Sequence, residues 1–401
     1  MRIAFVVQRY GPEINGGAEM EARLLAEHLS PYMQIDVLTT CAVDYMTWEN
    51  CLAPGLEQVN SVPVRRFPVR TPRNVAAFNR FSSEILARSR SFYDEMQWME
   101  LQGPDTPELF DYIQQHQDEY DLFLFFTYLY ATTYVGLQLA PHKSLLFPTA
   151  HDERWIHFDI FRPLFHLPRG FIFNSHEEEE FTRAKFRNDY IPGIVLGVGI
   201  DIPSVPLVET LKDEYILYLG RIDSSKGCDE LFRYFLRYKE ATRDPVKLVL
   251  IGAAVTPVPQ HLDIIHLGYM KEERFAWLRD AQLLVLPSAY ESLSLVTLEA
   301  WALGVPVLLN GRSPVLRGHC QRSNGGLFYD NEEEFIESLR LLRLKPELRL
   351  RLGRQGEAYV TQNYQWSRVT KQYVAFMRQM CQQTASGISS VGVNRQRVNR
   401  S

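Results

Sequence analysis

The sequence has 401 residues, of which 46% are apolar and 23% are charged. This is the composition of an ordinary globular protein, and the length suggests two to three domains. A formal net charge of -5 gives no general argument for nucleic-acid binding. The five cysteines lack the paired spacing of a metal site or a disulfide framework, and the amino terminus lacks the apolar core of a signal peptide, so we expect a cytoplasmic protein.

Strand and helix patterns alternate through the first half of the chain. A helix is expected at 18–29, and Gly16 and Gly17 precede it, removing side chains where the backbone comes close to a partner beside the helix N–H groups. A flexible turn is the alternative interpretation of this glycine pair. Apolar runs predict strands at 2–8, 34–40, 62–67, 122–126, 145–147 and 171–174.

Two other features of the first half need interpretation. Residues 122–141 contain no charged side chain, yet their threonines and tyrosines favour a strand followed by a helix at 132–139 over a membrane span. His151 directly follows the strand at 145–147, a position that can face a binding crevice. A lone histidine more often has a structural role, which is the alternative here.

A basic stretch lies between Arg65 and Arg90. Seven arginines alternate there with apolar side chains, and Glu84 is the only acid of the stretch. This pattern is compatible with peripheral contact to an anionic membrane or with a phosphorylated lipid acceptor. A solvated amphipathic helix whose arginines face water is the alternative.

The second half opens with a segment dense in glycine and proline, 192–206, which marks a hinge between two domains. An apolar strand begins near Tyr215, and a glycine-led loop with Arg221 and Lys226 follows before a helical pattern opens at Gly227. Two cations on a loop at the carboxyl edge of a sheet can neutralise two adjacent phosphates. Taken alone, the loop is equally explained as a solvated basic turn.

Residues 282–309 read as strand, loop, helix and strand. The loop carries Glu291, and Glu299 follows after seven intervening residues inside the helix, so both carboxylates can face one crevice. A diphosphate flanked by two hydroxyl-binding carboxylates describes a nucleotide sugar. The positive end of the helix dipole, which suits a phosphate, is formed by the N–H groups near Ser294, Leu295 and Val296.

Together these motifs resemble the retaining glycosyltransferases of the large GT4 family. The likeness rests on the Arg221/Lys226 loop, on the Glu291/Glu299 pair with the following EAWALGVPV, and on the amino-terminal RIAFVVQRYGPEINGGAE. It implies an α/β protein of the GT-B fold, with two Rossmann-like domains facing each other across a cleft. The expected parts are an acceptor-side domain at 1–195, a donor-binding domain at 207–365, a helix at about 366–383 that packs back on the first domain, and a disordered tail at 384–401.

The resemblance also implies roles for single residues. Glu291 holds hydroxyls of the transferred sugar and Glu299 those of the ribose, while the Gly16/Gly17 loop closes over the donor phosphates. His151 contacts the donor sugar without acting as a general base. In the family, the segment at Tyr269 and Met270 contacts the base, and core packing is the alternative for Tyr269. Ser294 stands where glycine is common, so its side chain narrows the approach of the diphosphate.

The expected reaction is a metal-independent, retaining transfer of a hexose from a nucleoside-diphosphate sugar to a saccharide or lipid-linked acceptor in polysaccharide or glycoconjugate synthesis. A UDP-sugar is expected, with UDP-glucose as the leading example, and no cofactor or nucleic-acid partner. Arg221 and Lys226 stabilise the leaving diphosphate in this account. One alternative is a GT-B nucleotide-sugar epimerase or hydrolase, and another is a non-catalytic subunit that binds a nucleotide sugar.

Overall fold

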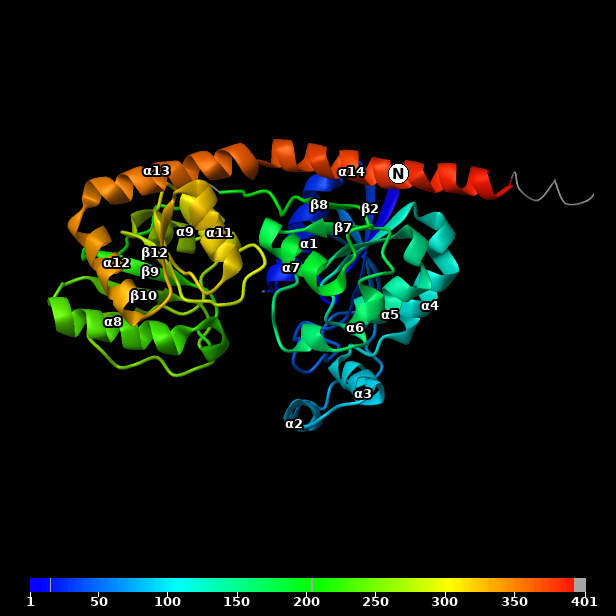
Figure 1. Ribbon diagram of the computed structural model, residues 1–401, viewed down its shortest axis with the longest axis horizontal. Helices are drawn as coiled ribbons and strands as arrows, with labels where there is room; N and C mark the ends of the chain where they lie inside the picture. The colour runs from blue at the N-terminus through cyan, green and yellow to red at the C-terminus, as the bar shows by residue number, and fades with distance from the viewer. Residues whose placement is uncertain (15, 203–204, 393–401) are drawn as a thin grey trace, which may run out of the picture. The chain divides into compact units, whose positions relative to one another are not determined.

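The computed structural model describes residues 1–14, 16–202 and 205–392. The chain forms two compact units, coloured mostly blue to green and green to orange in Figure 1. The first unit contains Met1–Val198 and the chain from Val369 onward, and the second contains Gly199–Arg368. The boundaries expected from the sequence, 1–195 and 207–365, fall inside these two units.

The first unit is built on an eight-stranded sheet in the order β3-β4-β2-β1-β5-β6-β7-β8. All neighbouring strands are parallel except the edge pair β3 and β4. Such a sheet is covered on both faces, which explains why its central strands are continuous apolar runs. The strands are β1 (Arg2–Val6), β2 (Gln34–Thr40), β3 (Gly55–Val59), β4 (Val62–Phe67), β5 (Leu122–Phe126), β6 (Ser144–Phe147), β7 (Gly170–Phe173) and β8 (Gly193–Val195).

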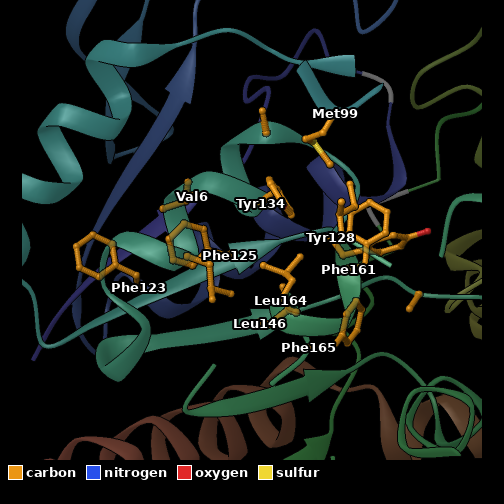
Figure 2. Close-up of a cluster of buried hydrophobic side chains, with 14 of the residues drawn as sticks. Val6, Met99, Phe123, Phe125, Tyr128, Tyr134, Leu146, Phe161, Leu164 and Phe165 are labelled. Atoms are coloured by element: carbon orange, nitrogen blue, oxygen red, sulfur yellow. The ribbon is translucent and has the colours of Figure 1, made fainter. Parts of the chain in front are cut away.

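The core of the first unit gathers where helices pack on β5 and β6. Figure 2 shows Phe125 and Leu146 of these strands beside Tyr134, Phe161 and other side chains of the cluster, all buried. Residues 122–141 therefore form a buried strand and helix, as expected. The helices of the unit are α1 (Gly17–Leu29), α2 (Val75–Ala87), α3 (Phe92–Gln102), α4 (Pro107–His116), α5 (Ala131–Leu139), α6 (Phe161–Leu164) and α7 (His176–Phe186).

The second unit has a six-stranded, fully parallel sheet in the order β11-β10-β9-β12-β13-β14. Its strands are β9 (Tyr215–Leu219), β10 (Lys247–Ile251), β11 (Ile264–His266), β12 (Leu284–Leu286), β13 (Val307–Asn310) and β14 (Gly326–Tyr329). The helices are α8 (Cys228–Thr242), α9 (Arg274–Asp280), α10 (Leu295–Ala302), α11 (Pro314–Ser323), α12 (Glu332–Leu344) and α13 (Pro346–Asn363). Both units thus have the doubly wound arrangement that the sequence predicts.

The last helix, α14 (Trp366–Gly392), returns the chain to the first unit. Tyr373 Oη donates to the Gly197 carbonyl oxygen at 2.7 Å, and Met380 lies against Gly170. The helix runs beyond its expected end at 383, since no proline interrupts the sequence before Gly392. The expected disordered tail, 384–401, therefore begins as helix, and residues 393–401 lie outside the described part.

Within the described residues, the helices are too short or too polar to cross a bilayer.

Candidate functional site

The site expected in the second unit lies at the point where the strand order reverses. β9 is the first strand of that unit; the chain proceeds to β10 on one side of it and later to β12 on the other. In open α/β sheets, ligands bind outside the carboxyl ends of the strands at such a switch point. The loop after β9 carries Arg221 and Lys226, and the loop after β12 carries Glu291.

Contacts of the Tyr218 and Asp223 side chains hold the loop after β9 in place. The buried Tyr218 donates its hydroxyl to the Arg221 carbonyl oxygen at 2.7 Å. Arg221 Nε lies 3.1 Å from Asp223 Oδ2, and Asp223 accepts from Ser225 N at 2.8 Å to cap the short turn that ends in Lys226. Burial works to raise the pKa of Asp223, but the Ser225 hydrogen bonds and the two cations outweigh it and lower the pKa. Asp223, which the sequence did not single out, therefore fixes this loop.

A direct contact joins the two loops. Lys226 Nζ donates to Glu291 Oε1 at 2.9 Å, and the two side chains are 37% and 15% exposed. The expected phosphate-binding cation and the expected sugar-binding acid thus lie side by side at the surface of the sheet edge. Sixty-five positions separate them along the sequence, so this contact is a product of the fold.

The backbones of the same two loops also touch at Gly227. A Cβ atom there would lie 2.5 Å from the Pro287 carbonyl oxygen, and the φ of Gly227 is +79°. Glycine meets both demands because it has no Cβ and enters the left-handed region without strain. Gly227 therefore sets the close approach of the loops that brings Lys226 to Glu291.

The loop after β12 leads into α10 through Ser294. Its φ of 68° and ψ of 73° are left-handed, a conformation that explains why glycine suits this position. The Ser294 side chain turns toward the helix and lies 2.9 Å from Thr297 Oγ1. Thr297 N and Leu298 N donate to the Ser294 carbonyl oxygen, so the N–H groups of Leu295 and Val296 stand before the first intrahelical bond.

Glu299 lies further along α10 and is paired with a residue that the sequence did not suggest. Arg274 Nη2, at the start of α9, lies 2.5 Å from Glu299 Oε1. Burial raises the pKa of Glu299 above its ordinary value, although the charge and hydrogen bond of Arg274 oppose this rise. Glu291 and Glu299 are therefore both held by cations, one by Lys226 and the other by Arg274.

Tyr269 and Met270 line a hollow on the same unit. Its volume is about 510 Å³, and Tyr269 is 52% exposed, so the alternative of Tyr269 as core filler is wrong. The Gly268 carbonyl oxygen accepts from Gly252 N at 2.8 Å, so this carbonyl already takes part in a hydrogen bond within the unit. The hollow is lined by Val208, Tyr269, Met270, Lys271, Glu273 and Trp277.

The remaining predicted residues, Gly16, Gly17 and His151, lie in the first unit. The two glycines differ in the space that surrounds them. A Cβ on Gly16 would lie 2.0 Å from Glu19 Oε2, whereas a Cβ on Gly17 would meet nothing within 4 Å. Glu19 is buried and accepts from Arg9 Nε at 2.9 Å and Gln8 Nε2 at 2.8 Å. The buried Glu19 carboxylate thus leaves no room for a side chain at position 16. The space beside Gly17 is open, so a ligand can approach the start of α1 there.

His151 follows β6 as expected. Its side chain is 29% exposed, and its Nε2 lies 3.8 Å from Glu153 Oε2. Glu153 in turn accepts from the Tyr128 hydroxyl at 2.6 Å. The loop therefore presents an oriented, partly exposed imidazole at the carboxyl edge of the first sheet.

Glu178 holds the loop of His151 from inside the first unit. Its Oε1 accepts from Ala150 N and its Oε2 from Asn174 N, each at 2.6 Å. Burial raises the pKa of Glu178 to about 8; these hydrogen bonds oppose the rise, and nearby Glu21 adds to it. Burial thus favours the protonated form of this carboxyl, which lies next to the His151 loop.

The raised pKa makes stability depend on pH. Because the folded protein holds this proton more tightly than the unfolded chain, stability is full below the ordinary glutamate pKa and falls as pH rises toward 8. The loss is at most about 1.4 kcal/mol per pH unit. We expect the melting temperature to decrease less between pH 5.5 and pH 8 in Glu178→Gln than in the wild type. Glu180→Gln, at an exposed position, is the matched control and should behave like the wild type. Equal pH slopes for wild type and Glu178→Gln would contradict this expectation.

The arginine-rich stretch is largely neutralised inside the first unit. Arg65 stacks on the Tyr112 ring, with its Cζ 4.9 Å from the ring centre, and five of the other six arginines have a polar partner. The pairs are Arg66 with Glu57, Arg70 with Asp105, Arg73 with the Gln102 carbonyl, Arg88 with Asp94 and Arg90 with Glu95. Most arginines of this stretch therefore belong to ion pairs with acids outside 65–90, although the paired Arg70 and Arg88 side chains remain 68% and 50% exposed.

The fold is that of GT-B glycosyltransferases, and comparisons with known proteins agree. Residues 204–359 match the family model of glycosyl transferases group 1. An uncharacterized glycosyltransferase of Methanocaldococcus jannaschii is 25% identical over 376 residues, covering 84% of this chain and 87% of that protein. The second unit of the chain is thus similar to the group 1 glycosyltransferases, which agrees with the resemblance to the GT4 enzymes.

Two solved structures illustrate the fold. The E. coli trehalose-6-phosphate structure bound with UDP-2-fluoro glucose superposes with a TM-score of 0.71 at 12% identity, covering 94% of this chain and 99% of that chain. Anabaena HepE in complex with UDP and glucose gives a TM-score of 0.66 at 14% identity, covering 94% and 100%. At these identities the likeness establishes the GT-B fold and nothing finer.

Proposed function

We propose that this glycosyltransferase moves a hexose, with retention of configuration and without a metal ion, from a UDP-sugar such as UDP-glucose to a saccharide or lipid-linked acceptor. The observation that carries the proposal is the contact of Lys226 with Glu291 beside the start of α10. It brings a phosphate-binding cation, a hydroxyl-binding acid and helix N–H groups to one switch point. The UDP and UDP-sugar complexes of the structural neighbours support the choice of donor.

The ion pairs suggest how the donor is bound. Arg221 is paired with Asp223, and Lys226 with Glu291, so the loop cations are balanced before a ligand arrives. A diphosphate carries more charge than one carboxylate and draws Lys226 toward itself. Glu291 then loses its partner and can accept hydrogen bonds from the sugar. In this way, binding of the phosphates prepares the residue that orients the transferred hexose.

The chemistry follows from where charge develops. The bond between the anomeric carbon and the β-phosphate oxygen breaks, and Arg221, Lys226 and the N–H groups of Leu295 and Val296 stabilise the charge left on the diphosphate. The acceptor oxygen bonds to the anomeric carbon on the face that the diphosphate leaves, and its proton passes to the departing phosphate. The cations come from the protein, which is why we propose no cofactor. His151 is proposed to hold a sugar hydroxyl.

The base is proposed to sit in the hollow beside Tyr269 and Met270. Trp277 contributes an apolar wall to it, while Lys271 and Glu273 supply polar groups. A flat base fits such a mainly apolar surface with a few polar groups at its rim.

A donor panel tests this function. We expect thermal stabilisation by one nucleoside-diphosphate sugar, since a ligand at about 100 times its Kd adds roughly 2.7 kcal/mol, and transfer to an acceptor with the anomeric configuration kept. Conversion of the donor alone would instead identify an epimerase or hydrolase. Binding without transfer to any acceptor would identify a non-catalytic subunit. No binding of any nucleotide sugar would reject the proposal.

Cytoplasmic action in polysaccharide or glycoconjugate synthesis, with peripheral membrane contact through Arg65–Arg90, completes the proposal. Because most of these arginines already have partners, we expect weak binding to anionic vesicles, carried by the exposed Arg80 on α2. Vesicle flotation of the wild type and Arg80→Glu measures it. Absence of the wild type from the floating fraction would remove membrane contact from the account.

A further inference from the structure

His319 lies on α11 in the interior of the second unit and is fully buried. The rings of Trp301 on α10 and Tyr359 on α13 meet it edge-on, with centroids 6.1 and 6.0 Å away. A buried imidazole needs hydrogen bonds to replace those it makes with water. Its Nε2 lies 3.0 Å from the Leu293 carbonyl oxygen, and its Nδ1 lies 3.3 Å from Tyr359 Oη. The side chain thus ties α11 to the loop after β12.

The partner of Nε2 determines which nitrogen of the ring carries the hydrogen. A carbonyl oxygen can only accept, so Nε2 carries a hydrogen and donates it to Leu293. In the neutral ring Nδ1 is then the acceptor, and the Tyr359 hydroxyl is placed to donate to it. His319 is therefore a hydrogen-bond donor to the backbone of the loop after β12, one residue before Ser294.

The bonded carbonyl belongs to the peptide group that joins Leu293 to Ser294. A trans peptide is planar, and its C=O and N–H point in opposite directions. Because His319 holds this C=O toward the interior of the unit, the Ser294 N–H points away from the histidine at the start of α10. Together with the N–H groups of Leu295 and Val296, it forms the positive end of the helix, where the diphosphate is proposed to bind.

The backbone conformation of Ser294 also needs support. Its φ of 68° and ψ of 73° are left-handed, and a residue with a Cβ keeps this conformation only when its surroundings hold it there. Rotation of the Leu293–Ser294 peptide plane would change this φ and relieve the strain. The hydrogen bond from His319 opposes the rotation. Without it, the plane is free to turn, and the Ser294 N–H turns with it.

We propose that His319 is a positioning residue of the phosphate site: its Nε2–H holds the Leu293–Ser294 peptide in the orientation that turns the Ser294 N–H toward the diphosphate. The inference rests on the proposed function, which supplies the diphosphate. His319 acts on the donor only through the backbone. Tyr359 holds Nδ1 in turn, so α11 and α13 both take part in shaping the start of α10.

Calorimetric titration of the full chain with UDP and with uridine tests the proposal. A hydrogen bond to a charged group corresponds to about a 10- to 100-fold change in affinity, and only UDP offers phosphates to the Ser294 N–H. We therefore expect His319→Leu to reduce the preference for UDP over uridine by about tenfold. Its affinity for uridine should stay close to that of the wild type.

Two amide variants separate the hydrogen bond from the packing of the ring. A glutamine N–H can reach the position of Nε2, whereas the shorter asparagine cannot. His319→Gln should therefore restore part of the preference for UDP, and His319→Asn should behave like His319→Leu. This pair keeps the test decisive if the leucine variant does not fold, which the melting temperature of each variant shows.

Tyr238→Phe is the matched control. Tyr238 is also buried, and its hydroxyl donates to Asp244 Oδ2 at 2.5 Å near the end of α8, beside the amino end of β10. The variant loses a buried hydrogen bond of the same unit away from the switch point. It should lower the melting temperature while keeping the wild-type preference for UDP.

The possible contrary results have different meanings. An unchanged preference for UDP in His319→Leu and His319→Asn would overturn the inference while leaving the proposed function intact. Loss of affinity for UDP and uridine by the same factor would make His319 merely structural, which also overturns it. A wild type that binds UDP no better than uridine, or does not bind UDP, would reject the proposed function itself, and the inference with it.

Discussion

Replacing Lys226 with alanine is expected to lower turnover by about two to three orders of magnitude, the usual effect of losing one charge-stabilising donor in an active site. Arg221→Ala should have an effect of similar size. Both cations lie on the loop after β9, and with the N–H groups at the start of α10 they stabilise the charge that develops on the leaving diphosphate. Donor-dependent turnover measured at saturating acceptor tests this expectation.

A matched control for the Lys226 variant exists in the same unit. Lys247 is also ion-paired, with Asp263 at 2.7 Å, but it begins β10 at the amino end of the sheet, away from the switch point. Lys247→Ala should therefore keep near-normal turnover. Near-normal turnover in both Arg221→Ala and Lys226→Ala would reject the assignment of the phosphate site.

Substitution of Glu291 should separate binding of the sugar from binding of the diphosphate. In Glu291→Ala, Lys226 loses its 2.9 Å partner and is free to bind phosphate, so affinity for UDP should be unchanged or higher. Turnover should fall about 10- to 100-fold because the hydrogen bonds to the sugar hydroxyls are lost. Glu291→Gln, which retains one acceptor oxygen, should lie between the wild type and the alanine variant.

Parallel measurements of UDP affinity and turnover decide this prediction. If UDP affinity falls by the same factor as turnover, Glu291 supports the loop and does not orient the hexose. A second version of the same comparison uses the Lys226→Ala/Glu291→Ala double variant. Because the two residues share one contact, the double variant should lose less than the product of the two single effects.

Much of the fold could be predicted from apolar patterning. The buried run of β5 and the strands β2 and β4 have the predicted bounds, because continuous or β-branched apolar residues mark strands covered on both faces. The edge strands β3 and β8 were missed. β3 is largely exposed and contains Glu57 and Gln58, whereas β8 has only three residues. In both, pairing with a neighbouring strand rather than local preference makes the segment a strand.

The candidate site was predictable only where its chemistry lies on adjacent residues of the sequence. The Arg221/Lys226 loop and the spacing of Glu291 and Glu299 can be recognised along the chain. Arg274 was missed because a cation on a short helix resembles a solvated residue until its partner, 25 positions away, is known.

The basic stretch, 65–90, shows that the charge of a surface is also hard to predict from the sequence alone. Its arginines appear unbalanced when they are counted over 65–90, because the acids that pair with them lie just outside this stretch or, in one case, further along the chain. Arg70, for example, pairs with Asp105 at 2.9 Å. Local charge counts therefore overstate the charge that a surface presents when ion pairs form between segments far apart in the sequence.

The central claim is that the second unit binds a diphosphate through Arg221, Lys226 and the N–H groups at the start of α10. Calorimetric titration of the wild type and of the Arg221→Ala/Lys226→Ala double variant with UDP, UMP and uridine tests it most directly. The account predicts that the wild type prefers UDP to UMP by at least about tenfold, as expected for charge-assisted hydrogen bonds to the second phosphate, and that the double variant loses this preference. Equal affinity of the wild type for all three compounds, or an unchanged preference in the double variant, would contradict it.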